Sequence, residues 1–145
     1  MLVLVGKKDI NYERLEQQSR ADLINNIVFT DFVSESQLRW LYENCSAYVF
    51  PSLSEGFGLP AIEAMVHGAP VVSSDATCLP EIYGDAALYF DPLDTTDMAN
   101  KIEELLENKK LAKDLIEKGY KQAAKYSWER MAKQTLIVYE KALKD

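Results

Sequence analysis

Short, uninterrupted apolar runs are the clearest pattern along this chain. Five of them stand out, at residues 2–5, 27–29, 47–50, 71–72 and 87–90. Continuous rather than alternating apolarity is typical of strands that are covered on both faces, as in parallel sheets. The pattern therefore predicts five short buried strands.

Helical patterns separate these strands. Ser34 and Gln37 have the spacing of a capping box and predict a helix over residues 34–42. Residues 60–67 predict a second helix, with Pro60 at its first position and Gly68 just past its end. Alternation of strands and helices predicts an α/β fold, a Rossmann-like parallel sheet with helices on both faces.

After residue 90 the strand signals stop and helices take over. Asp94 is placed to cap a helix whose apolar residues are Met98, Ala99, Ile102, Leu105 and Leu106. A further helix follows to about Tyr126, and Ser127 opens a last one with Trp128, Met131, Leu136, Tyr139 and Leu143 on one face. We expect these helices to pack onto the sheet, and the whole chain to form one domain.

Composition narrows the class of protein. The chain has 145 residues, 48% of them apolar and 27% charged, which is typical of a globular domain. A net charge of −7 argues against nucleic acid as a partner, since the lysines of residues 109–125 alternate with acids. Cys45, Cys78 and His67 are too few for a disulfide framework or a metal site, so we expect no metal and a reducing, cytoplasmic setting. No apolar run is long enough for a bilayer, and we see no signal peptide.

Residues 50–63 hold the candidate chemistry. A strand ends near Phe50, a loop with Gly56 and Gly58 follows, and a helix begins at Pro60. Glycines let the backbone approach a ligand closely. The backbone N–H groups of Ala61 and Ile62, at the helix start, favour an anion such as a diphosphate.

Two acids flank this loop. Glu63 lies in a helix that is apolar nearly all round, so we expect it to be largely buried and to reach back toward the site, where a carboxylate could accept hydrogen bonds from ribose hydroxyls. The alternative is a carboxylate satisfied by the helix start and local backbone donors. Glu55 is either an exposed loop acid or, with the glycines behind it, a ligand contact.

Residues 55–63 resemble the E-x7-E motif of glycosyltransferase family 4, a group of retaining enzymes with the GT-B fold. Both acids, both glycines and the proline fall in register. Residues 79–92, which begin Leu-Pro-Glu and end Asp-Pro, are similar to a second family segment, and residues 27–34 resemble the strand and turn that face the nucleotide base. The closing helix at Ser127 also fits, so the resemblance covers nearly the whole chain.

The resemblance implies a role for each site residue. Glu55, the candidate catalytic residue, would contact the donor sugar near the reacting centre, and Glu63 would bind the ribose. The remaining donor contacts would be the backbone of Gly56, Phe57, Gly58 and Leu59 at the sugar and diphosphate, and Phe32 and Val33 by the base. For Phe32 a core position is equally compatible.

The implied reaction moves a hexose, with retained anomeric configuration, from a donor of the GDP-mannose or UDP-hexose type to a saccharide or lipid-linked acceptor. Polysaccharide assembly is the implied setting. No cofactor or metal is implied, because helix N-termini and basic side chains stabilise the leaving diphosphate. Residues 1–145 would then be the C-terminal, nucleotide-sugar-binding domain.

The family pattern also contains parts that this sequence lacks. These are an N-terminal acceptor domain, through which any membrane contact would be made, and the first strand, loop and helix of the donor domain. We therefore expect the chain alone to bind nucleotide sugar weakly and to transfer nothing efficiently. Residues 75–78, Asp-Ala-Thr-Cys, also stand where many members have glycines.

Two other functions remain compatible with the residues. One is a non-catalytic subunit that binds nucleotide sugar and works with a separate acceptor-binding chain. The other is a sugar-nucleotide epimerase, which needs further acid–base residues around the sugar, whereas the sequence offers only Glu55. A P-loop or dinucleotide-binding enzyme is disfavoured because neither glycine-rich motif occurs.

Overall fold

The computed structural model describes residues 1–22 and 24–144. The chain divides into two compact units, Met1–Leu41 and Tyr42–Asp145, called here the N-terminal and C-terminal units. Both contain parallel sheet with helices, as the apolar runs predict. The expectation of one domain over residues 1–145 stays a prediction.

The N-terminal unit is a strand–helix–strand arrangement. Strand β1 (Leu2–Leu4) pairs in parallel with β2 (Ile27–Phe29), and α1 (Ile10–Ala21) lies between them in the sequence. The pattern of apolar residues did not predict α1, because its sequence is polar and Ser19 is its only buried residue among those described. Its start is specified by Asp9, whose carboxylate accepts the N–H groups of Asn11 and Tyr12 at 3.0 and 2.8 Å.

Helix α2 (Glu35–Asn44) confirms the predicted capping box. The Ser34 N–H donates to the Gln37 side-chain oxygen at 2.8 Å, and the Gln37 N–H donates to the Ser34 hydroxyl at 3.3 Å. Two N–H groups that the first turn leaves without helical partners are thereby satisfied.

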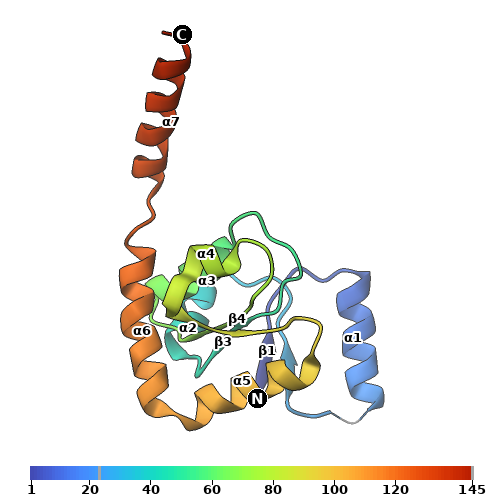
Figure 1. Cartoon of the computed structure of the whole chain (residues 1–145). Helices are drawn as coiled ribbons and strands as arrows, with labels where there is room; N and C mark the ends of the chain where they lie inside the picture. Colours follow the sequence, from blue (N-terminus) through green and yellow to red (C-terminus); the bar gives the residue numbers. More distant parts are fainter. Residues whose placement is uncertain (23, 145) are drawn as a thin grey trace. The chain divides into compact units, whose positions relative to one another are not determined.

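The C-terminal unit is built on a parallel three-stranded sheet of order β3-β4-β5. Its strands are β3 (Tyr48–Phe50), β4 (Val71–Ser74) and β5 (Ala87–Phe90). Every residue of the central strand β4 is buried. Figure 1 shows α3 (Leu59–Val66) on one side of this sheet and α5 (Thr95–Glu107) on the other, which accounts for the apolar residues on both faces of β4.

The remaining elements complete the core of this unit. They are α4 (Leu79–Tyr83), the 3-10 turn η1 (Gly84–Ala86) and α6 (Lys109–Ala123). Val72 and Phe90 of the sheet pack against Leu105 of α5 and Leu115 of α6. The predicted fold class, an α/β fold with parallel sheet and helices on both faces, is confirmed.

The last helix, α7 (Trp128–Ala142), differs from the expectation. We expected its apolar face to pack onto the sheet, but none of its described residues is buried. Leu136, Tyr139 and Leu143 are all exposed, and Figure 1 shows α7 in red continuing beyond α6. An amphipathic pattern identifies a helix, but it does not specify which surface covers the apolar face.

Candidate functional site

Two loops follow the carboxyl ends of the neighbouring strands β3 and β4, residues 51–58 and 75–78. Because the strands are parallel, both loops lie at the same edge of the sheet. The Ser74 hydroxyl, at the end of β4, donates to the Ser52 carbonyl at the start of the first loop. This edge is where ligands bind in open α/β sheets.

Gly58 ends the first loop in a left-handed conformation with φ 80°. The Tyr83 hydroxyl donates to its carbonyl oxygen at 2.7 Å. A Cβ at Gly58 would collide with Tyr83 and Leu79, whereas one at Gly56 would meet nothing within 4 Å. The sequence predicted that a ligand approaches the backbone at Gly58 closely. In the structure, Tyr83 makes that close approach. Gly56 is the glycine with open space beside it.

Helix α3 begins directly after Gly58, one residue earlier than predicted, so Pro60 takes the second position. Its first-turn N–H groups belong to Leu59 and Ala61 rather than to the expected pair of Ala61 and Ile62. Among residues 1–22 and 24–144, no side chain caps this helix, and its first turn carries no acid. Side chains do cap α1, α5, α6 and α7. The positive end of the α3 dipole is therefore left for an anion.

Glu55 is half-buried and is held at three points. The Ser52 hydroxyl donates to its Oε1 at 2.9 Å. Its N–H donates to the Thr77 hydroxyl at 3.2 Å, and its carbonyl accepts that hydroxyl and the Cys78 thiol, each at 3.2 Å. The sequence reasoning missed Ser52 and Thr77; hydroxyl residues placed just after two adjacent strands were the available signal.

Glu63 lies exposed, which corrects the expectation that it is largely buried. The buried residues of α3 are Ala61, Ile62, Ala64 and Met65. At 100° per residue Glu63 falls on the opposite side, with the exposed Leu59 and Val66. Among the described residues its carboxylate has no hydrogen-bond or ion-pair partner, so both oxygens are open to a ligand.

The buried Tyr42 and the half-buried Tyr48 both feel the Glu63 charge. Burial, followed by the Glu63 charge, raises the pKa of Tyr42 to about 12. Burial and the neighbouring Tyr42 raise the pKa of Tyr48, and Glu63 adds to that effect. Both phenols therefore stay protonated and uncharged at pH 7.

The other predicted residues have diverse positions. Phe57 is half-buried, with its ring edge-to-face to Tyr126 at 5.1 Å between centroids. Phe32, in the N-terminal unit, is 82% exposed, which removes its core interpretation within that unit, and Val33 beside it is half-buried. The roles of Phe32 and Val33 at a nucleotide base stay predictions.

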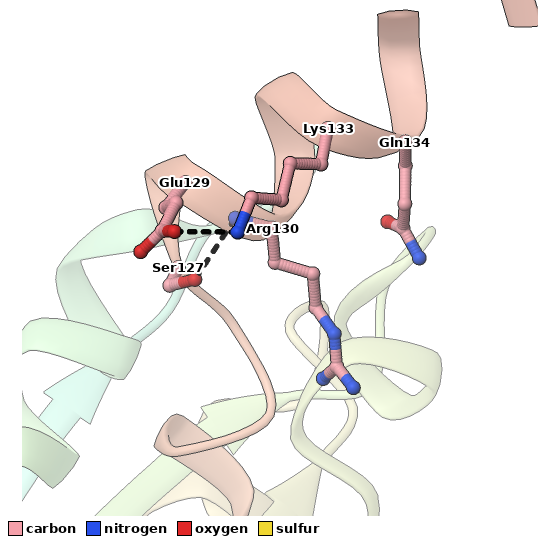
Figure 2. A pocket seen from close by; sticks show the side chains of 5 residues that line it. All are labelled: Ser127, Glu129, Arg130, Lys133 and Gln134. Atoms are coloured by element: carbon pink, nitrogen blue, oxygen red, sulfur yellow. Dashed lines mark hydrogen bonds and ion pairs between the residues drawn. The ribbon is translucent and has the colours of Figure 1, made fainter. Parts of the chain in front are cut away.

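Figure 2 shows a hollow along the start of α7, lined by Ser127, Glu129, Arg130, Lys133 and Gln134. Its charges are already engaged: Lys133 pairs with Glu129 at 2.6 Å, and the Arg130 guanidinium donates to the Lys125 carbonyl at 2.8 Å. None of the predicted site residues lines it, so the candidate site is the pair of loops and the start of α3.

The described residues offer neither a metal site nor a membrane-spanning helix. Residues 1–22 and 24–144 contain no group of three side chains suited to hold a metal ion. Over the same residues, no helix combines the length and apolarity needed to cross a membrane.

Comparison with known proteins gives concordant matches. The family model described as glycosyl transferases group 1 matches residues 1–122. O-antigen chain mannosyltransferase B of Escherichia coli is 36% identical over 96% of this chain and 37% of its own length. The chain therefore spans well under half of that relative.

Solved structures agree on the fold. Sucrose-phosphate synthase from Thermosynechococcus elongatus superimposes with a TM-score of 0.86 and 28% identity, covering 99% of this chain and 38% of that one. HepE of Anabaena, solved in complex with UDP, gives a TM-score of 0.82 at 23% identity, covering 96% of this chain and 40% of its own; at that identity it shows the fold alone.

Proposed function

This chain belongs to the glycosyl transferases group 1 family, and we propose that it is the donor-binding part of a retaining hexosyltransferase. The observation that carries the proposal is the edge of the sheet formed by β3 and β4. There a half-buried acid, a helix start and an exposed acid follow one another within residues 55–63. Within the described part of the chain, no side chain caps that helix start and the exposed acid has no partner.

Each part of this edge suits one part of a nucleotide sugar. Glu55 is fixed by Ser52 and by the second loop. Its carboxylate accepts hydrogen bonds from hydroxyls of the donor sugar near the anomeric carbon. The start of α3, with the backbone of residues 56–59, takes the diphosphate, because its N–H groups and dipole favour an anion. Glu63, one turn further along, accepts ribose hydroxyls.

In the reaction, the bond from the anomeric carbon to the diphosphate breaks and a bond to the acceptor oxygen forms on the same face of the sugar. The proton of the acceptor hydroxyl passes to the leaving diphosphate. The leaving diphosphate gains negative charge, and the N–H groups of Leu59 and Ala61 are placed to stabilise it. We propose no resident metal. Acceptor recognition, for a saccharide or a lipid-linked saccharide, belongs in this proposal to parts of the whole enzyme beyond this chain.

The relatives' names favour a mannosyl donor. Several of the similar proteins are named as mannosyltransferases. One of them is O-antigen chain mannosyltransferase B, which matches nearly all of this chain. This supports a donor of the GDP-mannose type and a role in polysaccharide assembly. A HepE structure in complex with UDP-glucose, which aligns at 25% identity, supports a uridine donor as the alternative.

Calorimetric titration with GDP, UDP, ADP and their hexose conjugates, with and without EDTA, tests the proposal. One nucleotide family should bind, in both buffers. Glu63→Gln should lower the affinity for the nucleotide and for its hexose conjugate alike, by about ten- to hundredfold, because hydrogen bonds to a charged group are lost. Glu55→Gln should weaken only the conjugate.

The control is Glu107→Gln, an exposed acid at the end of α5 and outside the site, which should bind as the wild type does. Binding of no nucleotide, or binding that is indifferent to Glu63→Gln, would contradict the donor-site assignment. Binding that is lost in EDTA would contradict the metal-free mechanism.

A further inference from the structure

The loop that carries Glu55 is joined to the loop after β4 through one side chain. The Thr77 hydroxyl accepts the Glu55 N–H and donates to the Glu55 carbonyl, both at 3.2 Å. The neighbouring Cys78 thiol donates to the same carbonyl at 3.2 Å. Both polar groups of the Glu55 backbone are therefore fixed from outside its own loop.

Thr77 adopts a backbone conformation that its residue type disfavours. Its φ is 51°, in the left-handed region where a β-branched residue is strained and glycine is not. Such strain persists where the surroundings over-determine the conformation. The two hydrogen bonds to Glu55 hold Thr77 in this conformation, and they require a hydroxyl at this position.

A second set of contacts fixes the Glu55 carboxylate. Ser52 donates to Oε1 at 2.9 Å, and the carbonyl of Ser52 is itself held by the buried Ser74 hydroxyl. Ser74 thus anchors the start of the loop to β4, and Thr77 anchors the loop at Glu55. If the Thr77 contact is removed, Glu55 remains tethered only by its own loop and by a weak thiol donor.

We propose that Thr77 is a positioning residue: its hydroxyl holds the Glu55 backbone, and through it sets how much more tightly the site binds a nucleotide sugar than the free nucleoside diphosphate. The inference rests on the proposed function, in which Glu55 contacts the sugar. It adds a determinant of sugar binding that lies on a different loop from the two acids.

Thr77→Gly and Thr77→Ser separate this role from folding. Glycine removes the hydroxyl and also relieves the left-handed strain, so the urea midpoint should match or exceed that of the wild type. Exchange of the Glu55 amide hydrogen, measured by NMR without ligand, should become about three- to tenfold faster, as for the loss of one ordinary hydrogen bond. Thr77→Ser keeps the hydroxyl and should restore the slow exchange, with the Val72 amide as internal reference.

The binding arm uses GDP, GDP-mannose, UDP and UDP-glucose. In Thr77→Gly the affinity for the sugar conjugate should fall by about three- to tenfold while that for the matching diphosphate is unchanged, and Thr77→Ser should behave as the wild type. Thr77→Gly in a Glu55→Gln background should cause no further loss, because the group being positioned is already removed.

The outcomes are distinguishable. The inference alone would be overturned if exchange of the Glu55 amide is unchanged in Thr77→Gly. It would also be overturned if that exchange becomes faster but the preference for the sugar conjugate does not change, while Glu55→Gln does reduce that preference. Faster exchange together with a preference that neither Glu55→Gln nor Thr77→Gly alters would overturn the proposed role of Glu55 instead. A lower urea midpoint in Thr77→Gly that Thr77→Ser fully restores, with unchanged relative affinities, would reduce Thr77 to a structural residue.

Discussion

At the residue scale, Gly58 is the most constrained position of the candidate site. Its φ of 80° is left-handed, and Tyr83 and Leu79 occupy the space where a side chain would begin. Gly56, two residues earlier, has open space instead. The two glycines of this motif therefore serve different purposes. Gly56 leaves the backbone accessible to a ligand, and Gly58 allows Tyr83 and Leu79 to pack against the backbone.

Gly58→Ala should lower the free energy of unfolding by about 2–4 kcal/mol, combining left-handed strain with overpacking against Tyr83. Urea denaturation followed by circular dichroism measures this change. Gly56→Ala is the matched control and should shift the free energy of unfolding by less than about 1 kcal/mol. Equal effects of the two substitutions would show that loop flexibility, not the Tyr83 contact, requires Gly58.

The sequence named Glu55, Gly58 and Glu63 as candidates because glycines and acids between a strand and a helix are visible in the sequence, and their roles in a site stay predictions. Their surroundings were harder to predict. The exposure of Glu63 was not predicted, because an apolar helix does not reveal which of its faces meets the sheet. The contacts of Thr77 were missed because they join residues 22 positions apart.

At the element scale, helix caps on α5 and α7 have the same form but different consequences. Asp94 accepts the N–H groups of Thr96 and Asp97 at 2.8 and 3.1 Å, and Ser127 accepts that of Arg130 at 3.1 Å. Helix α5 contributes the buried Leu105 to the core, whereas α7 contributes no buried residue. A cap can affect global stability only if its helix unfolds together with the core.

Asp94→Ala should therefore reduce the free energy of unfolding by about 1 kcal/mol. Ser127→Ala, which removes an equivalent cap, should change it by less than about 0.5 kcal/mol and should only increase amide exchange in the first turn of α7. Urea midpoints of the two variants, measured side by side, make the comparison. A similar loss for both would show that α7 folds cooperatively with the sheet.

Elements were predicted where the local pattern is strong. The five apolar runs all became strands, and the caps at Ser34 and Asp94 marked helix starts correctly. Helix α1 was missed because its stability depends on a cap and on few buried residues. The amphipathic pattern of α7 did not reveal that none of its described residues is buried.

At the scale of the whole molecule, buried phenols make stability depend on alkaline pH. Burial raises the pKa of Tyr42, which is 7% exposed, to about 12 from its ordinary value near 10. The folded state thus binds this proton more tightly than the unfolded state. The contribution is complete below about pH 10 and is lost as the pH rises toward 12.

The free energy of unfolding should accordingly fall above pH 10, by up to about 1.4 kcal/mol per pH unit for each such phenol. Urea midpoints between pH 8 and pH 11 record the slope. Tyr42→Phe should make the slope shallower, and Tyr139→Phe, which alters a 64% exposed ring on α7, should leave it unchanged. If Tyr42→Phe does not alter the dependence of the urea midpoint on pH, groups other than Tyr42 cause the loss of stability at alkaline pH.

The thiol beside Glu55 has a practical consequence. Cys78 and Cys45 are both free and half-buried, but burial raises the pKa of Cys45, which slows its reaction with alkylating reagents near neutral pH. The Cys78 sulfur lies 3.2 Å from the Glu55 carbonyl. If the donor sugar binds at Glu55 as we propose, we expect it to shield this thiol from the reagent. The ratio of label on the two cysteines is then an intrinsic footprint of occupancy, readable by mass spectrometry without any probe attached to the nucleotide.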